Sequence, residues 1–246
     1  MDRLTAPTGQ RQADGSASCP LRLTLTGERT LPGIGHENYW FRRHEAAYLA
    51  LAPLLRGTVV EAGAGEGYGT ELLRAHGARV LALELDPAAA THARARYAVP
   101  VARADLQAMP LLSGSVDAVA SLQTIEHLHD QEAFVGECAR VLRPRGVLAI
   151  TTPNSRTFPK GNPFHTRELE LAELVALLGP SFTVTHRWGV QARGHLEGIE
   201  AEQLAVPQEQ WGEELRARVE AVTAADFTVG PAAHDDLDLV VAAERR

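Results

Sequence analysis

Residues 58–69 join a short apolar run to a loop that has glycine at every second position. The run ends at Ala62, and the glycines are Gly63, Gly65, Gly67 and Gly69. Glycine adopts positive φ without strain, and it has no side chain to hold a ligand away from the backbone. We therefore expect a buried strand, a sharp turn and the start of a helix. Such a turn suits a nucleotide-like ligand, although turns and helix caps without a ligand also favour glycine.

The spacing of the glycines narrows the choice of ligand. A dinucleotide fingerprint places glycine at relative positions 1, 3 and 6, but Tyr68 occupies the sixth position here. The first three glycines occupy positions 1, 3 and 5, and Glu61 lies just before them. The loop also lacks the Lys-Ser/Thr ending of a triphosphate-binding loop. The pattern therefore disfavours both dinucleotide and triphosphate ligands.

Apolar segments of strand length alternate with segments of helical periodicity along the chain. We expect strands at residues 59–62, 78–85, 99–104, 116–122, 146–152, 182–188 and 237–243, and helices at 38–55, 70–75, 86–97, 132–142, 168–178 and 208–222. This alternation is typical of an α/β domain with a doubly wound, mostly parallel sheet and helices on both faces. Ligands of such sheets bind at the carboxyl ends of the strands, so the loops after the first five strands form the candidate site.

A chain of 246 residues fits one α/β domain. We expect a disordered tail at residues 1–24 and a single domain at 25–246. Helix 38–55 would act as a lid or simply as a cover over the sheet, and the insertion 191–234, between the sixth and seventh strands, would shape the ligand site. Trp211 in this insertion is a candidate platform for stacking against a ligand or a core aromatic.

Charge and cysteine content limit the partners and the compartment. The net charge of −7 is spread along the chain without a basic stripe, which argues against nucleic acid as a partner. Cys19 and Cys138 form neither a metal-binding spacing nor a disulfide framework. The N-terminus resembles no signal peptide, and no apolar run approaches membrane-spanning length. These features predict a cytoplasmic protein without a membrane partner.

Carboxylates follow the second and third predicted strands. Glu84 ends the second strand, 23 residues after Glu61, where a carboxylate can accept hydrogen bonds from both hydroxyls of a ribose. Asp86 precedes Pro87, a pair that favours a helix N-cap. Asp105 follows the third strand, where it would accept a hydrogen bond from an adenine amino group or serve only as a turn residue. Together the two strand-end acids predict a nucleoside site.

Histidines lie in the next two loops. Imidazole titrates near neutral pH and can take a proton from a hydroxyl group, so His127 after the fourth strand is the candidate general base. Glu126 or Gln123 would orient it. In the long loop 154–166, His165 is the second polar group predicted at the substrate. Thr166 is expected to cap the helix that follows, and Glu168 to lie in its first turn, where a carboxylate complements the helix dipole.

The chain resembles the class I S-adenosylmethionine-dependent methyltransferases. Residues 61–67 resemble the first motif of that family, 115–119 the fourth-strand motif, and 140–148 the segment that leads into the fifth strand. The resemblance implies a Rossmann-like seven-stranded sheet with an antiparallel last strand, and S-adenosylmethionine as cofactor. It assigns Glu84 to the ribose and Asp105 to the adenine.

The remaining cofactor residues expected from this resemblance lie along the same edge. They are Glu61, Gly63, Gly65, Gly67, Leu106 and Gln123. The segment 39–44 places aromatic residues beside cations just before the first strand. Within it, Arg43 is the predicted partner of the methionine carboxylate of the cofactor.

A narrower resemblance concerns residues 25–30, 37–44, 162–168 and 223–227. These segments look like actinobacterial methyltransferases associated with methylglucose lipopolysaccharide, a methylated polysaccharide. This resemblance implies O-methylation of a sugar hydroxyl, with a small molecule or an oligosaccharide as the substrate. An O-methyltransferase of a phenol, a quinone or another small metabolite is the alternative. A cofactor-binding protein without catalytic activity is a more remote one.

Two departures from the family patterns stand out. The usual Pro-Gly-Gly before the fifth strand is replaced by Pro144, Arg145 and Gly146, which bears on the flexibility of that turn. A related quinone-precursor group carries Glu-x-x-Glu-His after the fourth strand, where the acids can support a divalent metal. Gln123 replaces the first of these acids and removes one charged ligand, so the sequence predicts no metal.

Overall fold

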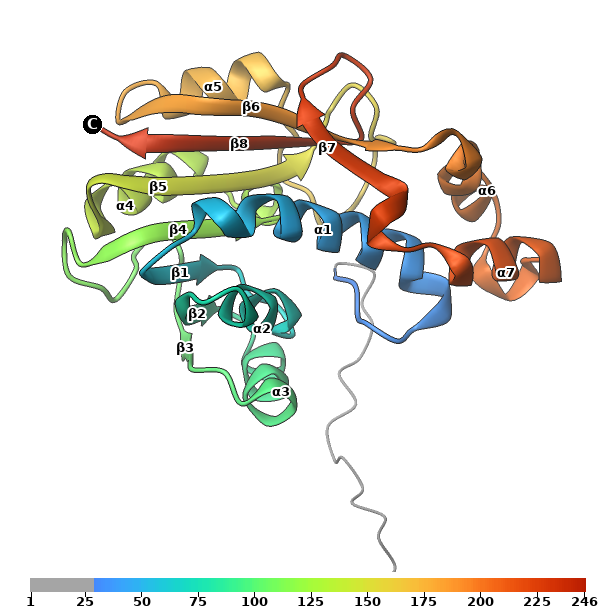
Figure 1. Ribbon diagram of the computed structural model, residues 1–246, viewed down its shortest axis with the longest axis horizontal. Coiled ribbons are helices and arrows are strands. Elements are labelled where there is room, and N and C mark those ends of the chain that lie inside the picture. The colour runs from blue at the N-terminus through green and yellow to red at the C-terminus, as the bar shows by residue number, and fades with distance from the viewer. Residues whose placement is uncertain (1–28) are drawn as a thin grey trace, which may run out of the picture.

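The computed structural model describes residues 29–246, and the predicted disorder of residues 1–24 lies outside this range. The described strands form one eight-stranded sheet in the order β3-β2-β1-β4-β5-β8-β6-β7 (Figure 1). The strands are β1 (Thr58–Ala62), β2 (Arg79–Glu84), β3 (Val101–Arg103), β4 (Val116–Leu122), β5 (Leu142–Pro153), β6 (Phe182–Ala192), β7 (Phe227–Pro231) and β8 (Asp238–Arg245). Each of the seven expected strands therefore has a counterpart.

The sheet is mostly parallel, but it has one strand more than predicted. Strands β1 to β5 pair in parallel, while β8 runs antiparallel to both β5 and β6, and β7 runs antiparallel to β6. The prediction of seven strands was wrong because β7 lies inside the expected insertion 191–234. This strand ends in Gly230 and Pro231 and pairs only with β6 at the sheet edge, where a proline interrupts no second ladder of hydrogen bonds.

Helices cover both faces of the sheet (Figure 1). They are α1 (Asn38–Leu51), α2 (Tyr68–Ala75), α3 (Pro87–Tyr97), α4 (Gln131–Val141), α5 (Leu171–Leu178), α6 (Ile199–Ala205) and α7 (Glu213–Ala221). Side chains alternate between the faces of a strand. Val59 accordingly packs beneath α1 and α2, whereas Val60 belongs to the core beneath α4 and α5. Both neighbours are fully buried, as expected of a sheet covered on both sides.

Helix α1 packs on the sheet as the covering helix that the sequence predicts. Tyr39, Ala47, Tyr48 and Leu51 are all less than 5% exposed and join the core on this face. The helix ends at Leu51 and continues as a short 3₁₀ turn, Ala52–Leu54. Its role as a lid remains a prediction.

The starts of two helices test the expected caps. Asp86 caps α3 as predicted, since its Oδ1 accepts a hydrogen bond from the backbone N–H of Ala88 at 2.8 Å. Helix α5, however, begins at Leu171 instead of residue 168, with Glu170 as N-cap. Thr166 does not cap this helix, because its hydroxyl lies 2.9 Å from the carbonyl oxygen of Glu126 and 2.7 Å from that of Leu128, and its single hydrogen is directed to these acceptors. It ties the long loop to the loop after β4.

The segment between β6 and β8 is ordered into α6, α7 and β7 and lies at one end of α1 (Figure 1). The sequence predicts only one helix here, at 208–222. Trp211 is 9% exposed, and its Nε1 donates to the carbonyl oxygen of Val206 at 3.2 Å. Of the two roles predicted for Trp211, a stacking platform or a core aromatic, this burial supports the core aromatic. No helix in residues 29–246 is long and apolar enough to cross a lipid bilayer.

Candidate functional site

The glycine loop leaves β1 and turns sharply at the carboxyl edge of the sheet. Gly63 has a φ of +82°, and a Cβ atom there would lie 2.4 Å from Oγ1 of Thr124. Gly65 has a φ of +54°, and no other atom lies within 4 Å of the position that its Cβ would occupy. The first glycine is therefore required by a close approach, and the second leaves open space at the backbone. This space is a cradle of the kind that the predicted cofactor needs.

Glu61 lies beneath the loop and is fully buried. Its Oε1 accepts a hydrogen bond from the hydroxyl of Tyr48 at 2.6 Å, and its Oε2 accepts one from the hydroxyl of Thr70. Burial raises the pKa of Glu61 to about 7. The carboxylate thus ties α1 and α2 to β1. It supports the loop from below and is not among the residues that line the adjoining cleft.

A cleft of about 390 Å³ opens above the loop, within the size range of small-molecule sites. Glu84, Asp105 and Leu106 line it, as do Gly63, Gly65 and Gln123. Glu84 is 8% exposed, and its Oε2 accepts a hydrogen bond from the backbone N–H of Gly65 at 2.7 Å. Oδ1 of Asp105 accepts one from the backbone N–H of Gln107 at 2.9 Å. The structure thus brings the two predicted nucleoside carboxylates to one cavity.

Glu66 is a cleft residue to which sequence reasoning assigned no role. It lines the cleft and is 2% exposed, yet its Oε1 is buried without a hydrogen-bond partner among the described residues. Burial raises the pKa of Glu66 to about 8, and the carboxylates of Glu61 and Glu84 act in the same direction. An orphaned carboxyl oxygen beside the cradle fits a positively charged ligand. Its place in the glycine motif was the only signal in the sequence.

A second cavity, of about 420 Å³, adjoins the cleft. The two cavities share a wall made of Arg29, Thr30, His44, Gln123 and His127. Gln123 follows β4 with a φ of +51°, and its backbone N–H donates to the carbonyl oxygen of Thr151 at 2.9 Å. His44, on α1, was not predicted, although it belongs to the aromatic and basic segment 39–44. Burial lowers the pKa of His44 to about 4, so its imidazole is neutral at pH 7.

Glu126 and His127 lie on a single 3₁₀ turn, Ile125–His127, directly after β4. Nδ1 of His127 lies 3.0 Å from the carbonyl oxygen of Phe164, and this contact places the ring proton on Nδ1. Nε2 of His127 then faces Oε1 of Glu126 at 3.9 Å. Glu126 is 1% exposed, its Oε2 accepts a hydrogen bond from Thr152 at 3.0 Å, and burial raises its pKa to about 8. The carbonyl oxygen of Phe164 therefore has the role of orienting His127 that the sequence predicted for Glu126 or Gln123.

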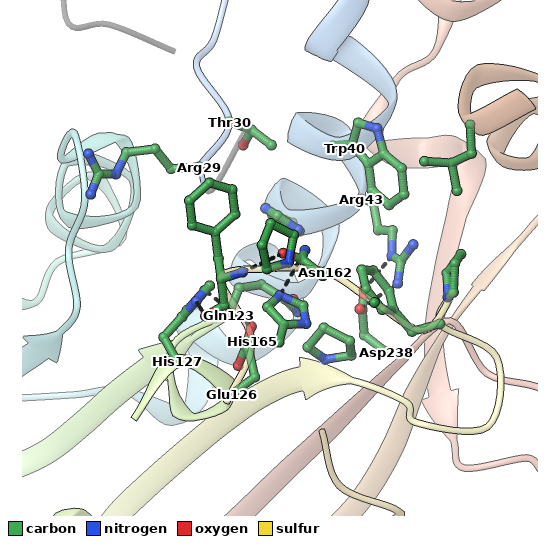
Figure 2. Close-up of a pocket in the computed structure, with 18 of the residues that line it drawn as sticks. Arg29, Thr30, Trp40, Arg43, Gln123, Glu126, His127, Asn162, His165 and Asp238 are labelled. Atoms are coloured by element: carbon green, nitrogen blue, oxygen red, sulfur yellow. Dashed lines mark hydrogen bonds and ion pairs between the residues drawn. The ribbon is translucent and has the colours of Figure 1, made fainter. Parts of the chain in front are cut away.

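His165 comes from the long loop and meets His127 at the second cavity (Figure 2). The centroids of the two imidazole rings are 5.0 Å apart. Nδ1 of His165 lies 2.8 Å from Oε1 of Glu168, and its Nε2 lies 3.3 Å from the amide nitrogen of Asn162. Glu168 therefore orients His165 and does not lie in the first turn of a helix. The structure brings all three predicted catalytic residues together.

Arg43 lies apart from the other predicted cofactor residues. It is 1% exposed, and its Nε and Nη2 donate to the two carboxylate oxygens of Asp238, each at 2.5 Å (Figure 2). Its Nη1 lies 3.1 Å from Oε2 of Glu200. Arg43 lines the second cavity and is not among the residues that line the cleft. Its predicted contact with the methionine carboxylate stays a prediction, and this geometry favours a structural role.

Comparisons with known proteins agree with this arrangement. Residues 60–150 match the methyltransferase-domain family. The chain is 47% identical over 254 residues to a "probable S-adenosylmethionine-dependent methyltransferase" of Mycolicibacterium smegmatis, covering 94% of this chain and 99% of that relative. It is 44% identical over 260 residues to a protein of the same description from Mycobacterium tuberculosis, covering 96% of this chain and 95% of that relative.

A solved structure shows the same fold. An S-adenosylmethionine-dependent methyltransferase of Thermotoga maritima has a TM-score of 0.59 and 20% sequence identity, and the match covers 84% of this chain and 93% of that one. The relatives of nearly equal length carry the assignment of family and cofactor. This chain therefore belongs to the S-adenosylmethionine-dependent methyltransferases, and its cofactor is S-adenosylmethionine.

Proposed function

We propose that this enzyme methylates a hydroxyl group of a sugar, within an oligosaccharide, a polysaccharide or a glycoside. The observation that carries the proposal is the shared wall between the cleft and the second cavity, in which His127 faces both. A cofactor in the cleft and an acceptor in the second cavity would meet at this residue. The second cavity is therefore the proposed acceptor pocket.

The chemistry of the acceptor pocket supports a sugar. A sugar ring has apolar C–H faces and a rim of hydroxyl groups, so it needs both aromatic surface and hydrogen-bonding groups. Trp40, Phe158 and Phe164 line the pocket and offer that surface. Asn162 and His165 line the same pocket and offer polar atoms to the hydroxyls. Pockets that combine apolar walls with a few placed polar groups are typical of small-molecule sites.

The protein must align the acceptor and manage its proton, because S-adenosylmethionine supplies a methyl group on a positively charged sulfur. In the proposed reaction Nε2 of His127 accepts the hydroxyl proton while the C–O bond forms. The electron pair of the broken C–S bond stays on sulfur, which yields S-adenosylhomocysteine. General-base help of this kind is worth about 10²- to 10⁴-fold in rate. A sugar hydroxyl is a weaker acid than a phenol and depends more on such help.

The test measures transfer of labelled methyl to glucose and mannose oligosaccharides and, in parallel, to phenolic acceptors. We expect transfer to a sugar, and a loss of about 100-fold or more in kcat for His127→Ala. Titration calorimetry with S-adenosylhomocysteine should show that this variant still binds the cofactor product. His76→Ala is the matched control, because His76 is exposed at the C-terminal end of α2 and lines neither cavity.

Two outcomes would count against the proposal. Transfer to phenolic acceptors but to no sugar would replace the substrate class and leave the enzyme a methyltransferase of small metabolites. Full turnover by His127→Ala with bound cofactor would remove His127 from the role of base. The first result would test which substrate the acceptor pocket binds, and the second would test which group accepts the hydroxyl proton.

A further inference from the structure

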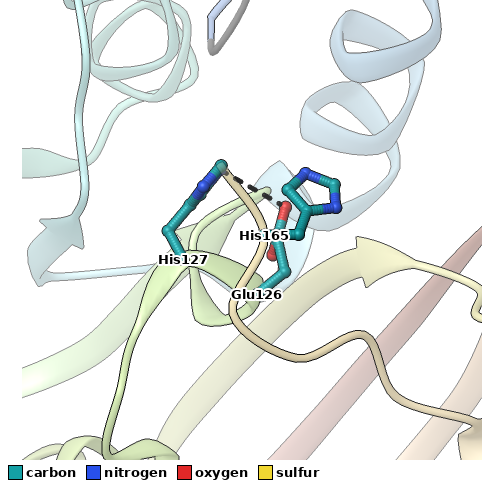
Figure 3. A group of neighbouring side chains, drawn as sticks. All are labelled: Glu126, His127 and His165. Atoms are coloured by element: carbon teal, nitrogen blue, oxygen red, sulfur yellow. Dashed lines mark ion pairs between the residues drawn. The ribbon is translucent and has the colours of Figure 1, made fainter. Parts of the chain in front are cut away.

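Three potential metal ligands meet at the wall of the acceptor pocket. Glu126 and His127 come from the turn after β4, and His165 comes from the long loop. One ligand atom from each lies within 4.8 Å of the other two. In Figure 3 the carboxylate of Glu126 lies between the side chains of the two histidines. Residues far apart in the sequence thus converge on one small volume.

The donor set matches a known class of cation. Two imidazoles and one carboxylate are the ligands of many catalytic zinc sites, and the same combination with open positions binds iron and related divalent ions. Mg²⁺ and Ca²⁺ prefer all-oxygen ligands, so the set favours Mn²⁺, Co²⁺ or Zn²⁺. The missing first acid of the Glu-x-x-Glu-His pattern, replaced by Gln123, is compensated here by an imidazole from another loop.

Each of the three side chains also makes a hydrogen-bonding contact with a further group, which fixes its orientation. Nδ1 of His165 lies 2.8 Å from the carboxylate of Glu168, and Nδ1 of His127 lies 3.0 Å from the carbonyl oxygen of Phe164. Oε2 of Glu126 accepts the hydroxyl hydrogen of Thr152 at 3.0 Å. Metal-binding histidines typically donate their other ring N–H to a carboxylate or a carbonyl. Both imidazoles have this arrangement, so Nε2 is the ring nitrogen of each that could bind a cation.

The gap between His127 and Glu126 suits a shared cation better than a direct hydrogen bond. Nε2 of His127 and Oε1 of Glu126 are 3.9 Å apart, beyond hydrogen-bonding distance. Bonds of about 2.1 Å to a shared ion would bridge such a gap. Nε2 of His165 accepts a contact from the Asn162 amide at 3.3 Å, which a cation would displace.

We infer that Glu126, His127 and His165 form a binding site for one divalent transition-metal ion. The three residues line the acceptor pocket, so the open coordination positions face the space assigned to the acceptor. Resting on the proposed function, an oxygen atom of the acceptor would complete the coordination shell. A cation bound to Nε2 of His127 would replace the general base that we propose for the metal-free enzyme. It would lower the pKa of the coordinated hydroxyl, whose proton would leave to solvent water.

The test titrates Mn²⁺ into the full-length protein after removal of metals with a chelator, without cofactor or acceptor. Loss of the free Mn²⁺ signal in electron paramagnetic resonance gives the stoichiometry and Kd. The visible spectrum of added Co²⁺ reports nitrogen ligands. We expect one ion per chain, and a Kd increase of at least about 100-fold in Glu126→Gln, His127→Ala and His165→Ala. Glu168→Gln should weaken binding by about 10- to 100-fold through the orientation of His165.

His76→Ala is the matched control and should bind Mn²⁺ like the wild type. Thermal melting in chelator identifies any variant that fails to fold, and the conservative change Glu168→Gln, which alters no proposed ligand, then carries the test. The inference is overturned if the wild type binds no ion below about 1 mM, or if the ligand variants bind like the wild type. Equal weakening by His76→Ala would also overturn it. Methyl transfer that persists in chelator leaves the proposed function intact, so the two failures are distinguishable.

Discussion

At the scale of single residues, three non-glycine positions in residues 29–246 have a positive φ. Ala98 ends α3, Gln123 separates the two cavities, and Arg145 lies in the turn before the parallel part of β5. Backbone strain at a functional site is retained where the surroundings enforce it. Gln123 has such surroundings, since its backbone N–H donates to Thr151 beside both cavities. Arg145 does not, because its side chain is 85% exposed and far from the site.

Arg145 therefore offers a simple test of strain. Its φ is +64°, a conformation that costs a residue with a Cβ atom about 1 to 2 kcal/mol. Glycine would remove this cost but would give the unfolded chain more freedom, worth about 0.4 to 1 kcal/mol. We expect Arg145→Gly to raise the free energy of unfolding by about 0.5 to 1 kcal/mol, measured by urea denaturation. Arg145→Ala keeps the Cβ atom and should show no gain; an equal gain would point to the side chain instead.

At the scale of elements, one buried ion pair joins α1 to β8 and to α6. Arg43 of α1 and Asp238 of β8 are separated by 195 residues in the sequence, and Glu200 of α6 contacts the same guanidinium. Breaking such a pair leaves a buried charge without its partner, which costs about 3 to 5 kcal/mol. The pair fixes the wall of the acceptor pocket to the end of the sheet.

We expect Arg43→Lys to lower the free energy of unfolding by about 2 to 3 kcal/mol, because lysine keeps the charge but loses the two-pronged geometry. Calorimetry should show that the affinity for S-adenosylhomocysteine stays within about threefold, since Arg43 does not line the cleft. Arg42→Lys on the same helix is the control, and its stability should not change. A tenfold loss of affinity without loss of stability would instead support Arg43 as the partner of the methionine carboxylate.

The order of elements could be predicted from the sequence where the pattern is local. Apolar runs gave the seven strands, and the Asp86-Pro87 pair gave the start of α3. Strand β7 was missed because Gly230 and Pro231 disfavour a strand away from a sheet edge. Helix α6 was missed because its seven residues, Ile199–Ala205, are too few for a clear periodicity.

The candidate site could also be predicted from the sequence only where it depends on local patterns. Carboxyl ends of parallel strands share one edge of the sheet, so the loops that carry Glu84, Asp105 and His127 could be grouped without a structure. The contacts between parts of the chain that are distant in sequence could not be predicted in this way. Glu168 was expected to serve a helix and instead orients His165, and Arg43 meets a carboxylate near the other end of the chain. Which of two roles a polar residue takes is decided by partners that spacing does not reveal.

At the scale of the whole molecule, buried acids in and beneath the glycine loop favour the protonated form. Burial raises the pKa of Glu61 to about 7 and that of Glu66 to about 8, from an ordinary value of 4.5. Between these values the folded chain binds more protons than the unfolded chain. The contribution of these two groups to the free energy of unfolding therefore falls as the pH rises from about 5 to about 8. Stability that these groups contribute is fully present below pH 4.5 and is lost above their raised pKa values.

Glu66→Gln isolates one of these two groups, because the amide resembles the protonated carboxyl and does not titrate. At pH 5 the variant and the wild type should have similar free energies of unfolding, whereas at pH 8.5 the variant should be more stable by on the order of 1 to 3 kcal/mol. Urea denaturation at both pH values without cofactor measures the difference. As a control, Glu71→Gln, on the exposed side of α2, should differ from the wild type in its free energy of unfolding by the same amount at both pH values. A Glu66→Gln difference that does not grow with pH would mean that Glu66 is ionised across this pH range, with its charge balanced by a neighbour such as Arg29, which acts to lower the pKa of Glu66.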